Sequence, residues 1–287
     1  MIGYHRPSTI DEALELRARH DVQVLAGGTD VYPAFATRRA WGDPSHKDVL
    51  DISAIGTLRG ISEEADHWRL GALATWTDLI RAQLPPCFDG YQNAARSVGG
   101  AQIQNRGTLA GNICTASPAG DGIPCLMTLD ARVELTSLRG IRVLPITDFI
   151  TGYRSTATMN DEIVTALLVP KSNGQGGFLK LGARRYLVIS IVMVAAVIDA
   201  GDDGRIRAAR LAVGSCSAVA CRLQSLEDAL VGQWLRDAGE VVVADHLAAL
   251  TPRDDVRGSG HYRHDAALTL VRDVLAGLAS GVVRRAA

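Results

Sequence analysis

The sequence predicts an α+β chain of two domains, and three observations carry this prediction. Strand-like and helix-like segments alternate along the N-terminal part, and a linker-like stretch, Lys171–Gly177, ends that alternation. Beyond it, a small antiparallel meander leads into segments of helical periodicity that continue to Ala287. With 287 residues, 47% of them hydrophobic, the chain is long enough to bury a sizeable core. The expected domains are 1–172, with subdomains at about 1–55 and 56–172, and 173–287.

The first subdomain begins with alternating strands and helices around a glycine loop. The expected elements are a strand at Tyr4–Pro7, a helix capped by Ser8 or Thr9, a buried strand at Val22–Leu25 and a second helix to about Ala36. Gly27 and Gly28 therefore stand at a strand-to-helix junction, where outward-pointing backbone N–H groups can receive an anion, and Thr29 adds a hydroxyl. Neither GxGxxG nor GxxxxGK occurs in the sequence, so a different nucleotide-binding fold is expected.

The second subdomain leads from short strands and helices into another small-residue loop. Strands are expected at Val49–Ile52, Ile61–Glu63 and Trp68–Gly71, and helices after the cap Thr75 and at Tyr91–Val98, where Gly99 and Gly100 end the helix. The loop that follows, Asn105–Asp121, is crowded with Gly, Ala, Asn, Thr and Ser. Its backbone can approach another molecule closely and offer neutral hydrogen bonds, which suits a polyphosphate or a sugar. The same composition is also typical of ordinary turns.

Asp121 ends this loop and has two possible roles. Pro124 follows three residues later, so the pair predicts the start of a helix that reaches Asp130, with Asp121 as its cap. A carboxylate at the end of a sugar-binding loop can also accept hydrogen bonds from ribose or ribityl hydroxyls. Both roles stay open, and they are compatible.

The remaining segments predict mostly antiparallel strands. Expected are a hairpin of Arg132–Leu138 and Ile141–Leu144, a strand at Glu162–Val169, a turn at Gly174–Gly177 that opens the next strand, a strand at Phe178–Ala183, a buried strand in the apolar run Leu187–Ala200, and a strand at Ile206–Val213. The C-terminal domain is therefore expected to hold a three-stranded antiparallel sheet backed by helices.

Charge and cysteine usage exclude several classes of protein. Thirty Lys and Arg against 31 Asp and Glu leave a net charge of -1, so nucleic acid is not an expected partner. The run Leu187–Ala200 is too short to cross a membrane, and no secretory signal opens the sequence, so a cytoplasmic protein is expected. The five cysteines include no CxxC pair, which predicts reduced thiols. His261 and His264 are predicted to be a surface pair, so no metal is assigned.

Several motifs together resemble one family. Ala26–Asp30 and Asn105–Asp121, followed by Phe149–Thr156, Asp161–Val164 and Phe178–Arg185, closely resemble the FAD-binding medium subunits of the molybdenum hydroxylases, such as xanthine dehydrogenase and carbon monoxide dehydrogenase. The likeness covers essentially the whole chain. It implies a two-part FAD-binding domain of the PCMH-like type found in molybdopterin dehydrogenase flavoproteins, followed by the smaller C-terminal domain.

The resemblance implies a role for particular residues. The two loops would hold the FAD pyrophosphate between them, while Thr115 and Asp121 would grip the flavin's polar chain. Lys180 would approach the isoalloxazine ring, where a cation favours reduced, anionic flavin. The implied cofactor-binding residues are Leu25, Ala26, Gly27, Gly28, Thr29, Asp30, Val98, Gly99, Thr108, Ala110, Gly111, Asn112, Thr115, Asp121, Val164 and Lys180.

Two further features separate this chain from related flavoproteins. The first loop contains Thr29 and Asp30 but no His or Cys, so the FAD is expected to be non-covalent and dissociable. The chain also lacks the cysteine-rich insertion of some benzoyl-CoA reductase relatives.

Arg184 and Tyr186 are candidates to lie near the flavin. Tyr186 and the two residues after it depart from the acidic residues common in relatives, so gating by Arg184–Ser190 is left open, and no catalytic residue is assigned.

The function implied by the resemblance is electron transfer. A large subunit with a molybdopterin cofactor would hydroxylate a substrate, and a small [2Fe-2S] subunit would pass the electrons to FAD on this chain, within a dimer of heterotrimers. Reduced FAD would then deliver them to NAD, a quinone, oxygen or another carrier. Two other hypotheses are a free-standing flavin oxidase or reductase, and a docking subunit that has lost the cofactor.

Overall fold

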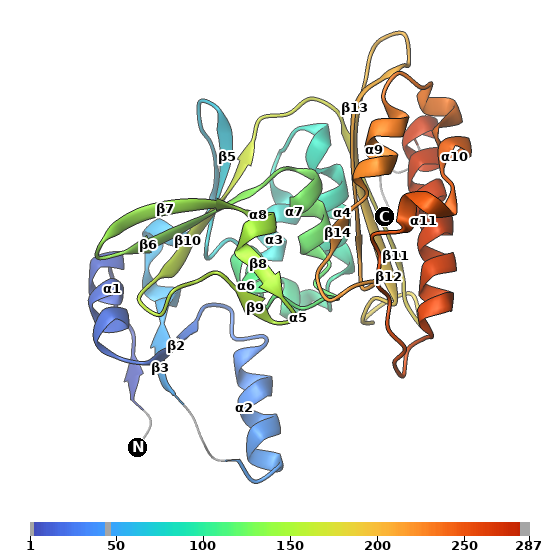
Figure 1. Ribbon diagram of the computed structural model, residues 1–287. Coiled ribbons are helices and arrows are strands. Elements are labelled where there is room, and N and C mark those ends of the chain that lie inside the picture. Colours follow the sequence, from blue (N-terminus) through green and yellow to red (C-terminus); the bar gives the residue numbers. More distant parts are fainter. Residues whose placement is uncertain (1–2, 44–46, 282–287) are drawn as a thin grey trace.

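A computed structural model describes residues 3–43 and 47–281 of the chain. Three groups of elements follow one another in space: a small N-terminal unit, a central sheet with its helices, and a second sheet covered by the C-terminal helices (Figure 1). The outer ends of the two expected domains, residues 1–2 and 282–287, lie outside the described residues. The division of the chain near residue 172 stays a prediction.

The N-terminal unit is a three-stranded parallel sheet in the order β1-β3-β2. Its elements are β1 (Tyr4–His5), α1 (Ile10–Arg19), β2 (Val22–Leu25), α2 (Val31–Ala40), β3 (Asp48–Asp51), η1 (Ile52–Ala54) and η2 (Gly56–Leu58). Thr9 caps α1 by accepting a hydrogen bond from the Glu12 backbone N–H at 3.3 Å, as the sequence predicted. Leu14 of α1 and Leu50 of β3 are buried together in a small core.

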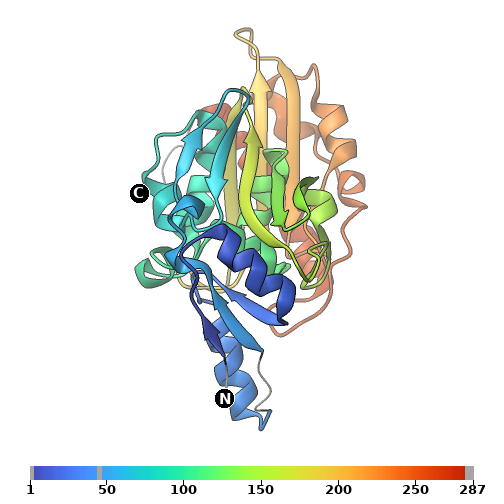
Figure 2. The ribbon, with the colours of Figure 1, turned by 90° about the vertical axis from the view of Figure 1, so that its left-hand side faces the viewer.

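The central unit is a five-stranded antiparallel sheet in the order β4-β5-β10-β6-β7. Its elements are β4 (Ile61–Glu63), β5 (His67–Gly71), α3 (Trp76–Arg81), η3 (Pro86–Phe88), α4 (Asp89–Ser97), α5 (Ala101–Gln104), α6 (Leu109–Thr115), α7 (Gly122–Thr128), β6 (Arg132–Ser137), β7 (Gly140–Pro145), α8 (Ile146–Phe149), β8 (Ile150–Gly152), β9 (Ser155–Thr156) and β10 (Ile163–Pro170). Thr75 and Asp78 form the capping box of α3. Figure 2 shows α1 in front of this sheet, where Arg17 Nε donates to the Glu162 carbonyl at 3.4 Å.

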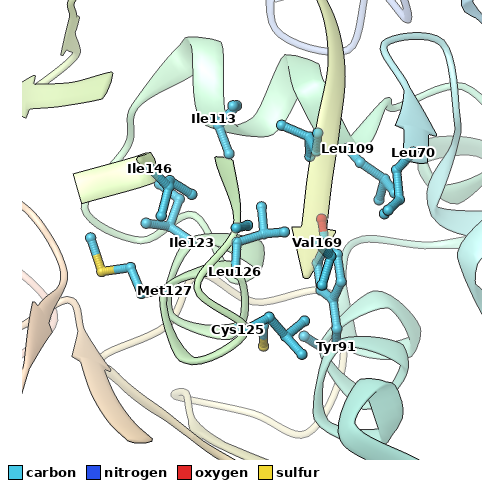
Figure 3. Packing of buried hydrophobic residues seen from close by; sticks show 14 of the residues in the cluster. Leu70, Tyr91, Leu109, Ile113, Ile123, Cys125, Leu126, Met127, Ile146 and Val169 are labelled. Carbon is cyan, nitrogen blue, oxygen red and sulfur yellow. The ribbon is translucent and has the colours of Figure 1, made fainter. Parts of the chain in front are cut away.

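One face of the central sheet packs on α4, α6 and α7. Figure 3 shows Leu109 and Ile113 of α6 and Leu126 of α7 meeting Leu70 and Val169 of the sheet, and all five are fully buried. The same buried cluster continues into the C-terminal sheet. The central and C-terminal units therefore share one hydrophobic core, which fixes their relative positions.

The C-terminal unit is a four-stranded antiparallel sheet with helices on both faces. Its elements are β11 (Gln175–Leu181), β12 (Val192–Ala200), β13 (Ile206–Gly214), β14 (Cys221–Arg222), α9 (Gln224–Leu230), η4 (Leu235–Asp237), α10 (Ala238–Val241), η5 (Ala244–Leu247) and α11 (Gly260–Ser280). Helices α4 and α7 pack on one face, while α9 and α11 cover the other (Figure 1). The expected α+β class is confirmed. The three expected strands are β11, β12 and β13, and the two residues of β14 extend the edge without leaving a pattern in the sequence.

Two local predictions were wrong. Gln175–Gly177 is not a turn but the start of β11, because glycines there let the strand lie against backbone: a Cβ on Gly176 would lie 2.4 Å from the Cys87 carbonyl oxygen. The apolar run also does not begin a strand at Leu187. Strand β12 starts at Val192, and Leu187 and Ile189 are exposed in the loop before it.

Candidate functional site

A cavity of about 680 Å³ lies between the N-terminal unit and helices α5 and α6 of the central unit. Such a volume is typical of sites for cofactors and other small molecules. Both glycine loops contribute to its wall. Among its lining residues are Ala26, Gly27, Gly28, Thr29, Asp30, Val98, Thr108, Ala110, Gly111, Asn112, Thr115 and Val164.

The two loops touch at Gly27. A Cβ built on Gly27 would lie 2.0 Å from the Arg106 carbonyl oxygen and 3.1 Å from Gly107 Cα, so only glycine permits this approach of two backbones. Gly28 has a φ of 78°, in the left-handed region that favours glycine. The pair of glycines thus fulfils two separate requirements, which are contact with the second loop and reversal of the chain into α2.

The second loop was expected to run from Asn105 to Asp121, but Leu109–Thr115 within it form α6, because Thr108 caps a helix there. Thr108 caps this helix, and its Oγ1 accepts a hydrogen bond from the Gly111 backbone N–H at 3.0 Å. Within the described part of the chain, Asn112 Oδ1 is buried and has no hydrogen-bond partner. This oxygen lies against Gly122, where an added Cβ would be 2.9 Å from it, so it packs inside the central unit and is not open to the cavity.

The donor set fits a dinucleotide that carries a diphosphate. Helix α2 begins immediately after the first loop, so its N-terminus lies within four residues of Gly27, and helix N-termini attract anions. Arg17, Arg38, Lys47 and Arg154 also line the cavity, against the acidic Asp21, Asp30 and Glu162, so the charged side chains of the lining carry a small positive excess. Small neutral residues such as Gly28, Ala110 and Gly111 make up much of the rest of the lining.

A buried ion pair lies beside the cavity, at the border with the C-terminal unit. Lys180 Nζ donates to Asp121 Oδ2 at 2.5 Å, and Ser190 Oγ donates to Asp121 Oδ1 at 2.5 Å. Burial raises the pKa of the Asp121 carboxyl, although the Lys180 ammonium and the Ser190 hydroxyl oppose that shift. Asp121 precedes α7 without capping it, because its carboxylate turns to Lys180 instead. The capping role that the sequence left open is therefore not observed.

Comparisons with known proteins agree with this geometry. Residues 1–172 match the family model of the FAD binding domain in molybdopterin dehydrogenase, and residues 178–278 match that of the CO dehydrogenase flavoprotein C-terminal domain. The chain belongs to this flavoprotein family. The resemblance found in the sequence is thereby confirmed, and membership makes FAD the expected ligand of the cavity.

Individual members of the family match over most of their length. The chain is 34% identical to the nicotinate dehydrogenase FAD-subunit of Eubacterium barkeri, covering 80% of this chain and 79% of that protein. It is 30% identical to the nicotine 6-hydroxylase medium subunit of Paenarthrobacter nicotinovorans, covering 94% and 95%. The structure of reconstituted CO dehydrogenase from Oligotropha carboxidovorans superimposes with a TM-score of 0.89 at 25% identity, covering 99% of each chain.

The cavity of this family member brings together most, not all, of the residues expected to bind the cofactor. Leu25, Gly99, Asp121 and Lys180 do not line it. Leu25 is only 3% exposed and belongs to the strand that positions the first loop. Their expected contacts with the cofactor stay predictions.

Arg184 and Tyr186, the other two residues expected near the flavin, lie in the exposed loop between β11 and β12 and do not line the cavity. The Tyr186 side chain is 62% exposed. The Arg184 guanidinium donates to the carbonyl oxygens of Tyr186 and Leu187, so it braces this loop from within. A role of either residue near the flavin stays a prediction.

The cavity also contains residues that sequence reasoning missed. Arg154 and Thr156 reach it from the β8–β9 hairpin and Thr158 from the loop that follows; the first two lie in the segment Phe149–Thr156 that carried the family resemblance, but no role at the cofactor was assigned to them. Phe35 and Arg38 reach it from α2, and the helical spacing from the first loop could have identified them.

Neither a metal site nor a membrane helix is found within residues 3–43 and 47–281. No group of three or more His, Cys, Asp or Glu side chains there could hold a metal ion. In the same ranges, no helix has the length and apolar character needed to cross a membrane.

Proposed function

We propose that this chain is the FAD-carrying electron-transfer subunit of a heteromeric molybdenum hydroxylase. The observation that carries the proposal is the contact between the two glycine loops at Gly27, which brings both loops to a single cavity. Family membership supplies the identity of the cofactor.

The residues of the chain bind and orient the cofactor. Backbone groups of Ala26–Thr29 and of Thr108–Asn112 hold the diphosphate from two sides, and Thr115 contacts the ribityl chain. Val98 and Val164 cover apolar surface of the ring system and keep water from it. When bound, FAD supplies the capacity to accept electrons from one redox partner and release them to another. Substrate hydroxylation takes place in another subunit, so this chain needs no general base for it.

The names of relatives support an assembly of several subunits. The similar proteins are named as the FAD-subunit of nicotinate dehydrogenase, the medium subunit of nicotine 6-hydroxylase and the medium chain of carbon monoxide dehydrogenase from Hydrogenophaga pseudoflava. We extend this to the present chain, with a large molybdopterin subunit and a small [2Fe-2S] subunit as partners in a cytoplasmic dimer of heterotrimers. The external acceptor is NAD, a quinone, oxygen or another carrier.

A rapid-mixing experiment tests the electron-transfer role. The complex that copurifies with the tagged chain is mixed anaerobically with nicotinate, a purine or an aldehyde, and flavin absorbance is followed. We expect one of these substrates to bleach the flavin in the complex, and none of them to be hydroxylated by the isolated chain. The dithionite-reduced chain is then mixed with NAD, quinone or oxygen to identify the acceptor. Hydroxylation by the isolated chain would overturn the proposal.

A further inference from the structure

Arg263 is a buried cation in the first turn of α11, where only 3% of it is exposed. Burial of a charge is costly, and the first turn of a helix disfavours a positive charge. Its ion pair, from Nη2 to Asp255 Oδ1 at 2.6 Å, is with a carboxylate whose side chain is 41% exposed. A well-packed apolar side chain often fills such a position at lower cost. The arginine is therefore explained better by the other groups that it holds.

The Arg263 Nη1 group holds two segments of the C-terminal sheet together. It donates to the Ile191 carbonyl at 2.6 Å and to the Ser215 carbonyl at 3.0 Å. Ile191 immediately precedes β12 and Ser215 immediately follows β13, at the same end of these paired strands. Ser215 has a φ of 64°, in the left-handed region that serine rarely adopts, and such a conformation persists only where its surroundings fix it. Arg263 therefore fixes both segments at this end of the sheet.

Both segments bind the residues that follow α6. Ser190, one residue before the first of the two carbonyls, donates from Oγ to Asp121 Oδ1 at 2.5 Å. The Ser215 backbone N–H donates to the Pro118 carbonyl at 3.0 Å. The post-α6 segment, residues 116–121, is thus held at two points by the strand ends that the buried arginine joins.

The post-α6 segment in turn fixes part of the cavity wall. Thr115, the last residue of α6, lines the cavity immediately before it. Ala116, the first residue of the segment, accepts a hydrogen bond from the Arg154 backbone N–H at 3.0 Å, and Arg154 also lines the cavity. Among the described residues, none after Val164 lines the cavity. The C-terminal unit therefore reaches the site through contacts of this kind.

We propose that Arg263 is a positioning residue for the proposed FAD site. It holds the ends of β12 and β13 where they bind the post-α6 segment, and that segment sets the places of Thr115 and Arg154 in the cavity wall. Arg263 itself does not line the cavity, so it acts on the cofactor through these intermediates. The inference rests on the proposed role as a FAD subunit, and it adds that the C-terminal unit sets the affinity for the cofactor.

A double-mutant cycle in the intact chain tests the inference. Arg263→Lys keeps the charge but loses the planar fork that reaches two carbonyls and a carboxylate, and Ser190→Ala removes the hydroxyl that binds Asp121. The matched control is Arg222→Lys. Arg222 also joins the C-terminal unit to the central unit, since its Nη1 donates to the Met127 carbonyl at 3.1 Å. It does so at the other end of α7, and it does not line the cavity.

Fluorescence titration gives the FAD affinity of each folded, FAD-free chain, urea unfolding gives its stability, and hydrogen exchange reports order in the post-α6 segment. We expect Arg263→Lys to weaken FAD binding roughly 5- to 30-fold, because a hydrogen bond to a buried carbonyl is lost. Ser190→Ala should weaken FAD binding roughly three- to tenfold. The double variant should lose less than the product of these two factors, because both groups act through one segment. Exchange in that segment should be faster in all three variants.

The control should separate positioning from stability. Arg222→Lys should lower the free energy of unfolding and leave FAD affinity within about twofold of the unaltered value. Arg263→Lys or Ser190→Ala binding FAD like the unaltered chain would overturn the inference, and Ser190→Ala decides if Arg263→Lys does not fold. Equal losses of affinity in Arg263→Lys and Arg222→Lys, or independent effects in the double variant, would also overturn it. These results leave the proposed function standing, whereas an unaltered chain that binds no FAD would overturn both.

Discussion

Substitution of Gly27 by alanine tests the contact between the two loops. The added Cβ would lie 2.0 Å from the Arg106 carbonyl oxygen and 2.8 Å from the Arg106 carbonyl carbon. Both neighbours are backbone atoms, so relief requires the loops to separate by about 1.4 Å, to an ordinary contact near 3.4 Å. Overpacking of this kind typically costs about 1–3 kcal/mol. If the separation is retained when the diphosphate binds, FAD affinity should fall by roughly 5- to 150-fold.

The assay is a fluorescence titration of FAD into the FAD-free Gly27→Ala chain, with urea unfolding run in parallel. Gly56→Ala is the matched control, because Gly56 is exposed and a Cβ there would meet nothing within 4 Å. The control should bind FAD like the unaltered chain. A Gly27→Ala chain that folds normally and binds FAD within about twofold of the unaltered affinity would refute the role assigned to the loop contact.

Three further predictions concern the second loop, pH and thiol chemistry. A Cβ on Gly111 would lie 2.7 Å from Thr108 Oγ1, so Gly111→Val should disturb the cap of α6 and reduce FAD occupancy; an unchanged flavin spectrum would contradict this. Burial opposes ionisation of Glu162, but two hydrogen bonds from Arg142 hold the pKa of its carboxyl below the usual value. The ionised carboxylate therefore stabilises the fold fully near neutral pH, and this stabilisation is lost as pH falls through the lowered pKa. Measured by urea unfolding, the free energy of unfolding should fall more steeply between about pH 6 and pH 3 in the unaltered chain than in Glu162→Gln. Burial raises the thiol pKa of Cys216 to about 12, so iodoacetamide should label it only after unfolding, as mass spectrometry would show.

Most of the fold could be predicted because its signals are local. Thr9 and Thr75 cap helices where the sequence placed them, and the hairpin of β6 and β7 follows the alternation of its residues. Predictions failed where a distant segment decides the local structure. The start of β11 depends on the approach of Cys87 to Gly176, and the exposed Leu187 shows that an apolar run need not form a strand.

The candidate site could be predicted only in part, for a similar reason. The two loops carry a compositional signal, and the structure places both on one cavity. The role of Asp121 could not be predicted from the sequence. Its carboxylate is bound by Lys180 and Ser190, which are far from it in the sequence and reach it only in the folded chain. Arg154 likewise reaches the cavity only through the folding of the β8–β9 hairpin.

The most direct measurement is the amount of FAD that the purified chain binds, and whether that FAD leaves when the chain unfolds. The FAD-free chain is incubated with excess FAD, separated from free ligand by gel filtration, and denatured in acid. We predict one FAD per chain by absorbance and its complete release into the supernatant, because the first glycine loop offers no His or Cys for a covalent link. A folded chain that retains no flavin, or flavin that precipitates with the polypeptide, would contradict a non-covalent FAD site in this cavity.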